Sequence, residues 1–223
     1  MAPKSRSSSE TRAVFPITMF AHLLFVAVLT LVLVWLLHFR EGLSFTSDNK
    51  QKLFNLHPFF MVIGFLLIVG QGIMVYNTIP ADRQRQKATH MTLNLTALLA
   101  GIVGLYAVFK FHHDLGIPNM YSLHSWLGMS TICLSILQFL FGFSAFMLPR
   151  GDKSNRGRYA PWHILFGLVI FFLAIITAMA GLTERFFFLN LRRSQEALVV
   201  NFTGLLIFLY GVSVLFTVLH RYW

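Results

Sequence analysis

The sequence predicts an all-α integral membrane protein with six transmembrane helices, and its composition is the first reason. Of the 223 residues, 56% are hydrophobic and only 12% are charged, whereas soluble domains carry about 25% charged residues. Apolar runs of about 20 residues recur along the whole chain, and each is long enough to cross a hydrocarbon core of about 30 Å. Four consecutive runs carry a histidine near their start. We therefore expect one six-helix membrane domain over residues 14–220, between short tails at 1–13 and 221–223.

The apolar runs define the expected spans, which are residues 14–38, 56–76, 90–110, 122–148, 162–183 and 197–220. Pro58 and Pro161 stand near the start of two runs, and we expect both in the first turn of their helices, where proline fits. An even number of spans puts both termini on one side of the membrane. That side carries eleven of the 18 lysines and arginines, and cytoplasmic loops are the ones enriched in these residues. We therefore expect both termini in the cytosol, and we favour an endomembrane of vacuolar or lysosomal type over the plasma membrane.

The formal net charge of +10 does not indicate a nucleic-acid partner. The basic residues are scattered among the ends of the apolar runs and form no patch interleaved with aromatic residues. Such a patch is typical of proteins that grip a nucleic-acid strand. The lipid bilayer, and no nucleic acid, is the expected environment.

Histidines occupy matched positions at the starts of spans two to five. They are His57, His90, His124 and His163. With the expected topology, His57 and His124 lie near the non-cytosolic face, and His90 and His163 lie near the cytosolic face. A titratable ring inside a membrane span is costly, so such residues usually mark a functional site. The four histidines sort by depth into two pairs within a central four-helix bundle, spans two to five, where each pair can hold one metal centre.

Haem is the group that suits these pairs. Its iron accepts axial imidazole, and its macrocycle is apolar enough to lie between helices. Two axial histidines per iron leave no open position for oxygen, which favours electron transfer. Cys133 is the only cysteine, so the chain has no CxxCH motif for covalent attachment. Zinc suits less well, because each level lacks a nearby Asp, Glu or Cys to complete four ligands. We expect two noncovalent haem b groups, with irons roughly 20 Å apart.

A simpler interpretation of any one histidine is an interfacial side chain that hydrogen-bonds at a helix end. His22, His38 and His220 have no partner of matched depth, and we assign them to that class. Matched depths on four consecutive spans favour ligation for the other four. A different class of function also remains open at this point, namely a haem-free transporter or channel in which the histidines relay protons.

Several motifs around these histidines resemble those of the cytochrome b561 family. They are Asn55-x-His57-Pro58, His90 after a basic loop, Phe111-His112, the Tyr-Ser-Leu-His-Ser-Trp run around His124, and Pro161-x-His163. The resemblance covers about residues 39–219. Members of this family are ascorbate-dependent transmembrane reductases with six helices and two b-type haems. The resemblance therefore implies His57 with His124, and His90 with His163, as axial ligands, and it implies a homodimer.

The same resemblance implies an ascorbate-type site on each face. On the cytosolic side the matching residues are Arg83, Lys87 and Arg156. Basic side chains suit ascorbate, a monoanion at neutral pH, although the positive-inside rule explains the same residues without a ligand. On the outer side the matching residues are Lys110, Phe111, His112 and Tyr121. His112 is the candidate catalytic residue, because it can accept or deliver the proton that accompanies each electron step.

Together these observations predict an oxidoreductase that moves electrons from cytosolic ascorbate through two haems to an outer acceptor, either monodehydroascorbate or a ferric chelate. The alternative within haem chemistry is a quinol-linked di-haem subunit of a larger complex. Two positions depart from the family pattern: Asn77 stands where many members have Lys or Arg, and Leu115 stands in a loop that is often more basic. Either departure can weaken ascorbate binding or alter the preferred acceptor.

Overall fold

The computed structural model describes residues 8–148 and 153–220, and these residues form long helices joined by short loops. In chain order the helices are α1 (Ser8–Val34), η1 (Trp35–Phe39), α2 (Lys50–Pro58), η2 (Phe59–Leu67), α3 (Ile68–Thr78), α4 (Arg83–Leu115), α5 (Leu123–Phe146), α6 (Lys153–Phe188) and α7 (Gln195–Leu219). Of these, η1 and η2 are π-helical stretches.

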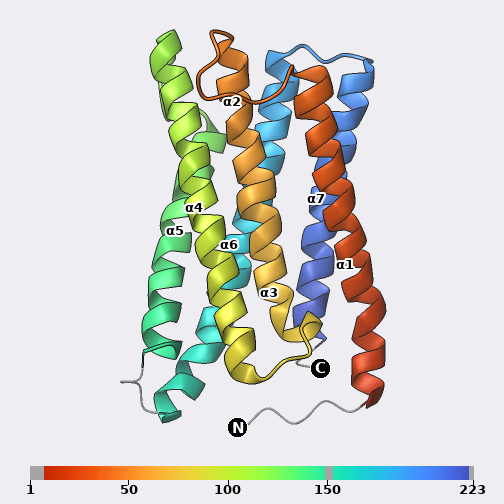
Figure 1. The fold of residues 1–223 in the computed structure, drawn as a ribbon, viewed down its shortest axis with the longest axis vertical. Helices are drawn as coiled ribbons and strands as arrows, with labels where there is room; N and C mark the ends of the chain where they lie inside the picture. The colour runs from red at the N-terminus through yellow and green to blue at the C-terminus, as the bar shows by residue number, and fades with distance from the viewer. Residues whose placement is uncertain (1–7, 149–152, 221–223) are drawn as a thin grey trace.

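Six helical segments are long and apolar enough to cross a membrane, which confirms the all-α, six-span prediction for the described residues. The second span is the continuous run of α2, η2 and α3. α1 begins and α7 ends at the same end of the bundle (Figure 1). Of the expected tails, residues 1–7 and 221–223 lie outside the described residues, and residues 8–13 already belong to α1.

Three clusters of buried side chains hold the described helices together, and the third, formed by Leu53, Leu56, Ala107 and Phe111, joins α2 to α4. The largest one joins α1 and α7 to η2, α3 and α6, and it includes Leu36, Phe171 and Tyr210. The second cluster, which includes Phe65 and Ile132, lies where the second span meets α4, α5 and α6. The second to fifth spans therefore form a bundle of their own, and α1 and α7 pack along one side of it (Figure 1).

The helices extend past the apolar runs that predict them. The second span begins at Lys50 and the third at Arg83, earlier than residues 56 and 90. Polar caps explain the difference: Asn49 accepts a hydrogen bond from the Gln51 N–H, and Asp82 accepts one from the Arg85 N–H. Such caps satisfy the free N–H groups of a first turn. Hydropathy cannot detect these polar turns, so the histidines lie deeper in their helices than expected.

The expectation that Pro58 and Pro161 lie in the first turns of their helices was wrong. Pro58 ends α2 and leads directly into η2, and Pro161 lies inside α6. Proline lacks an N–H and its ring crowds the carbonyl of the fourth preceding residue. After Pro58 the helix continues as the π-helical stretch η2, and the Phe59 N–H at its start donates to the carbonyls of Asn55 and Leu56. Single π-helical stretches of this kind are frequent near functional sites.

Candidate cofactor and substrate sites

The structure brings the four histidines together in two pairs. The ring centroids of His57 and His124 are 6.0 Å apart, and those of His90 and His163 are 6.1 Å apart. A metal ion held about 2 Å from each of two imidazole nitrogens separates the ring centroids by roughly 6 Å. The described parts of the chain contain no group of three or more His, Cys, Asp or Glu placed to hold a metal. The donor set at each level is therefore two imidazoles.

Each pair lies in its own pocket. The pocket around His90 and His163, here called the terminus-side pocket, lies at the end of the bundle where α1 begins and α7 ends, and its volume is about 770 Å³. The pocket around His57 and His124, the far-side pocket, has a volume of about 520 Å³. Both volumes fall in the range of about 300–1,000 Å³ that is typical of ligand and cofactor sites. Among the described residues only Phe65 lines both pockets.

Three of the histidines hydrogen-bond through Nδ1 to a backbone carbonyl. His57 pairs with Gly104 O at 3.1 Å, His90 with Gly72 O at 2.8 Å, and His124 with Thr177 O at 2.9 Å. A carbonyl oxygen only accepts, so Nδ1 carries the proton and Nε2 keeps its lone pair. Metal-ligating histidines almost always use their second nitrogen in this way, which fixes the ring orientation.

Glycines make room for the rings of His124 and His163 between α5 and α6. A Cβ on Gly181 would lie 2.6 Å from His124 Cε1, and a Cβ on Gly142 would lie 2.7 Å from His163 Cε1. Any side chain at either position would push the histidine ring away. Sequence reasoning missed both glycines, as well as Gly72, Gly104 and Thr177, because a small residue or a backbone carbonyl carries no chemical signal in the sequence.

Three cations gather in the terminus-side pocket. Arg83, Lys87 and Arg156 all line it together with His90 and His163, and its described lining contains no Asp or Glu. The Arg83 guanidinium lies 4.7 Å from the centroid of the Tyr76 ring. These residues give the pocket a positive potential that favours a small anion.

Arg156 carries an unused donor. Its Nη2 donates to the carbonyl of Leu148 at 3.1 Å, whereas its buried Nε–H has no hydrogen-bond partner in the described parts of the chain. Buried polar groups are nearly always hydrogen-bonded, so an unpaired donor in a pocket indicates a place for an acceptor.

Asn77 lines the same pocket and donates through Nδ2 to Thr217 O at 2.7 Å, which ties α3 to α7.

The far-side pocket receives three of the four residues expected on its face. Phe111, His112 and Tyr121 line it. His112 Nδ1 donates to the Asn119 side-chain oxygen at 2.9 Å, which leaves Nε2 of the neutral ring as an acceptor. Lys110 does not line the pocket; its Nζ lies 3.3 Å from Asp114, which also pairs with Lys50 at 3.0 Å. Leu115 does line the pocket.

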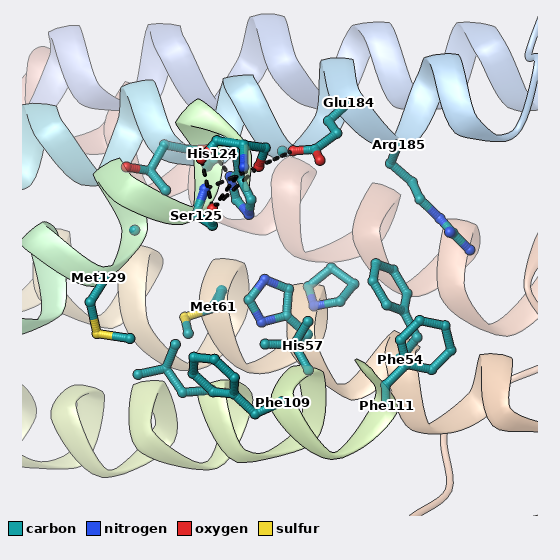
Figure 2. A pocket seen from close by; sticks show the side chains of 18 of the residues that line it. Phe54, His57, Met61, Phe109, Phe111, His124, Ser125, Met129, Glu184 and Arg185 are labelled. Carbon is teal, nitrogen blue, oxygen red and sulfur yellow. Dashed lines mark hydrogen bonds between the residues drawn. The ribbon is translucent and has the colours of Figure 1, made fainter. Parts of the chain in front are cut away.

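A carboxylate and a guanidinium that the sequence analysis did not single out also line the far-side pocket. Glu184 accepts a hydrogen bond from the Ser122 hydroxyl at 3.1 Å. Arg185 donates to the Gln51 side chain, and its guanidinium lies 4.3 Å from the centroid of the Phe54 ring. Figure 2 shows both residues on α6, with His57 and His124 reaching into the pocket from opposite walls. The available signal was their position as a charged pair directly after the fifth apolar run.

Tyr121 stands beside this carboxylate. Burial and, to a smaller extent, the negative charge of Glu184 raise the pKa of the Tyr121 phenol above its ordinary value. The phenol is therefore a hydrogen-bond donor throughout the neutral pH range. With one carboxylate and one guanidinium in its lining, the far-side pocket is less positive than the terminus-side pocket.

Comparisons with known proteins identify a family and several relatives of this chain. The model of the eukaryotic cytochrome b561 family matches residues 56–189. A protein of Oryza sativa subsp. japonica named as a probable ascorbate-specific transmembrane electron transporter is 48% identical over 204 residues, which are 89% of this chain and 87% of the relative. The transmembrane ascorbate ferrireductase 2 of Arabidopsis thaliana is 41% identical over 88% of each chain. A plasma membrane ascorbate-dependent reductase of Xenopus laevis is 41% identical over 86% of this chain and 70% of the relative.

Proposed function

This chain belongs to the eukaryotic cytochrome b561 family, which is a haem-binding family, and we propose that it transfers electrons across a membrane from ascorbate to an acceptor on the opposite face. The observation that carries the proposal is the placement of one facing histidine pair in a pocket at each end of a six-span bundle. The names of the relatives, which include ascorbate-specific electron transporters and ascorbate ferrireductases, support it.

The cofactors in this proposal are two haem b groups per chain, bound without a covalent link. His57 and His124 hold one, and His90 and His163 hold the other. Three features support the fit: the ring spacing within each pair, the Nε2 lone pairs left by the carbonyl contacts of three rings, and the glycines that leave space beside His124 and His163. When bound, haem supplies a one-electron redox centre near each face of the membrane.

The electron donor in this proposal binds in the terminus-side pocket. Arg83, Lys87 and Arg156 hold the ascorbate monoanion close to the ring pair, and the unpaired Nε–H of Arg156 provides a donor for one of its oxygens. Hydrogen bonds from an ionised donor are roughly twice as strong as those between neutral groups. The terminus side is the cytosolic side, a proposal supported by its excess of lysine and arginine in the sequence.

The electron acceptor, monodehydroascorbate or a ferric chelate, binds at the far-side pocket. Phe111 and Tyr121 offer apolar surface and a hydroxyl donor there, and Nε2 of His112 exchanges the proton that accompanies the electron. Lys110 belongs to the same face, but it pairs with Asp114 and does not line the pocket. The Glu184 carboxylate disfavours an anionic acceptor, and the nearby Arg185 offsets part of that effect.

The assembly and the membrane are further parts of the proposal. The family resemblance supports a homodimer, and the excess of lysine and arginine on the terminus side supports both termini in the cytosol. The preference for an endomembrane stays a prediction, and the printed name of the Xenopus relative places that protein in the plasma membrane. Localisation of a fluorescently tagged chain, together with cross-linking in native membranes, tests both points.

The decisive experiment is an optical titration of the detergent-purified protein with ascorbate. We expect b-type haem bands at two haems per chain, reduced largely by ascorbate, and the loss of one haem in His124→Ala and in His163→Ala. A colourless protein, or full haem content in either variant, would refute the proposal. Haem that stays oxidised with ascorbate but is reduced by a quinol would favour the quinol-linked alternative.

A further inference from the structure

His163 differs from the other three histidines in the partner of its Nδ1. The other three Nδ1 atoms face backbone carbonyls, whereas Nδ1 of His163 lies 3.0 Å from Nε2 of the Gln138 side chain. The same Gln138 nitrogen lies 2.6 Å from the backbone carbonyl of His163. A side-chain amide on α5 therefore contacts both the ring and the backbone of the histidine on α6.

The amide orientation and the ring tautomer determine each other. In the orientation of the structure, the amide nitrogen donates to the carbonyl of His163 and faces Nδ1, which must then act as the acceptor. A neutral ring that accepts at Nδ1 carries its proton on Nε2. A protonated Nε2 has no lone pair, so this arrangement cannot ligate a metal ion.

The opposite orientation of the amide reverses the roles of the two ring nitrogens of His163. When Oε1 faces the ring, it accepts from Nδ1–H, and Nε2 of His163 presents its lone pair toward His90, whose ring centroid is 6.1 Å away. Building on the proposed function, we propose that Gln138 is the positioning residue for His163, and that its amide turns over when His163 becomes an axial ligand. Gln138 then takes the acceptor role that backbone carbonyls take for the other three ligands.

The surroundings of Gln138 allow this turn. Its Nε2 packs against Gly167, where a Cβ would lie only 3.2 Å away, and Gly142 leaves open the space beside the His163 ring. Gln138 also lines the terminus-side pocket. The turn gives up the bond from the amide nitrogen to the His163 carbonyl. Because two acceptor oxygens repel each other, Oε1 must also shift away from that carbonyl as it accepts from Nδ1–H.

With Oε1 of Gln138 facing its ring, His163 is the ligand whose basicity depends on a side chain and not on a backbone carbonyl. An acceptor on Nδ1–H raises the basicity of the ligating nitrogen, and loss of such a partner typically lowers metal affinity about 10- to 100-fold. A carboxylate in the same place is a stronger acceptor than an amide, and a thioether is a much weaker one. Only the haem held by His90 and His163 should respond.

The test compares Gln138→Glu and Gln138→Met with wild type, and uses Ser135→Ala as the matched control. Ser135 lines the same pocket, but its hydroxyl donates to the carbonyl of Thr131 within α5. Redox titration followed optically and by electron paramagnetic resonance separates the two haems. We expect Gln138→Glu to lower the potential of the terminus-side haem, and Gln138→Met to raise it and weaken its retention about 10- to 100-fold. The potential of the far-side haem should stay at its wild-type value in both Gln138 variants. Ser135→Ala should leave both potentials unchanged.

Unchanged potentials in both variants, or equal shifts of both haems, would overturn the role of Gln138. If the Glu variant does not accumulate, Gln138→Met decides the question alone, with the far-side haem as the internal control for folding. A wild-type protein without haem would instead refute the proposed function, so the two failures are distinguishable.

Discussion

The ring of His124 lies directly against Gly181, so closely that a Cβ on this glycine would be 2.6 Å from His124 Cε1. The same contact recurs at the other end of the same two helices, where Gly142 of α5 faces the His163 ring of α6. α5 thus carries His124 for the far-side pocket and Gly142, which makes room for His163. α6 carries His163 for the terminus-side pocket and Gly181, which makes room for His124. The other helix pair shows a related exchange of hydrogen bonds, from His57 to Gly104 O and from His90 to Gly72 O.

This relationship predicts a selective loss of haem. In Gly181→Ala the new methyl group displaces the His124 ring, because a Cβ contact under 3.0 Å forces a shift. We expect the far-side haem to be lost while the terminus-side haem is retained. Haem content per chain, measured from the absorbance of the pyridine complex, checks this. Gly204→Ala is the control, since its Cβ would meet Leu182 at an ordinary 3.7 Å. Full haem content in Gly181→Ala would contradict the prediction.

The cations of the terminus-side pocket predict the affinity for ascorbate. A hydrogen bond to a charged group contributes about 1.5–3 kcal/mol, and each 1.4 kcal/mol is about a tenfold change in affinity. Arg156→Gln should therefore raise the ascorbate concentration for half-maximal haem reduction roughly 10- to 100-fold, with haem content unchanged. Stopped-flow reduction of purified protein gives this value. Arg158→Gln is the matched control, because Arg158 is exposed and does not line the pocket. Equal effects of the two substitutions would point to surface charge alone.

We predict that a lysine in place of Asn77 raises the affinity for ascorbate. A lysine in its place adds a fourth cation to a pocket whose described lining contains no acidic side chain, and a partly exposed ion pair contributes up to about 1 kcal/mol, or roughly fivefold in affinity. We expect the haem of Asn77→Lys to be reduced at lower ascorbate concentration, with the half-maximal ascorbate concentration lowered about two- to fivefold. Asn77→Leu also loses the bond to Thr217 O but adds no charge, so it separates the two effects. A similar affinity in both variants would exclude a role for charge at this position.

We predict that substitution of His112 slows electron delivery at the far side only. His112→Gln removes the nitrogen that can exchange a proton in the pocket, and positioned acid–base groups contribute about 10²- to 10⁴-fold to rates. We expect electron delivery from the reduced protein to monodehydroascorbate to slow by about tenfold or more, with reduction by ascorbate at the terminus side unaffected. Rapid mixing of reduced protein in liposomes with the acceptor measures this step. His113→Gln is the matched control, because His113 is exposed and lies outside the pocket lining. Identical delivery rates in the two variants would remove His112 from the mechanism.

Much of the fold and of the histidine arrangement could be predicted from the sequence. Hydropathy located six spans, because a bilayer imposes a fixed length of apolar chain on each helix. The depth of each histidine in its span then predicted which rings face each other. Boundaries were less accurate: Lys50 and Arg83 begin helices one to two turns before the apolar runs, because polar caps and not hydropathy set a helix start.

The sequence by itself determined the number of spans, the two levels of histidines and the positive charge near one end, since these properties depend on the order of residue types along each helix. Only the tertiary structure decided what holds each histidine in place. The partners of His57, His124 and His163 lie 47, 53 and 25 residues away in the chain, and two of the three are backbone carbonyls. The tertiary structure also decided that Lys110 pairs with Asp114 and that Arg156 lines the terminus-side pocket. Such contacts depend on how neighbouring helices rotate and pack, and single positions in a sequence do not encode that rotation.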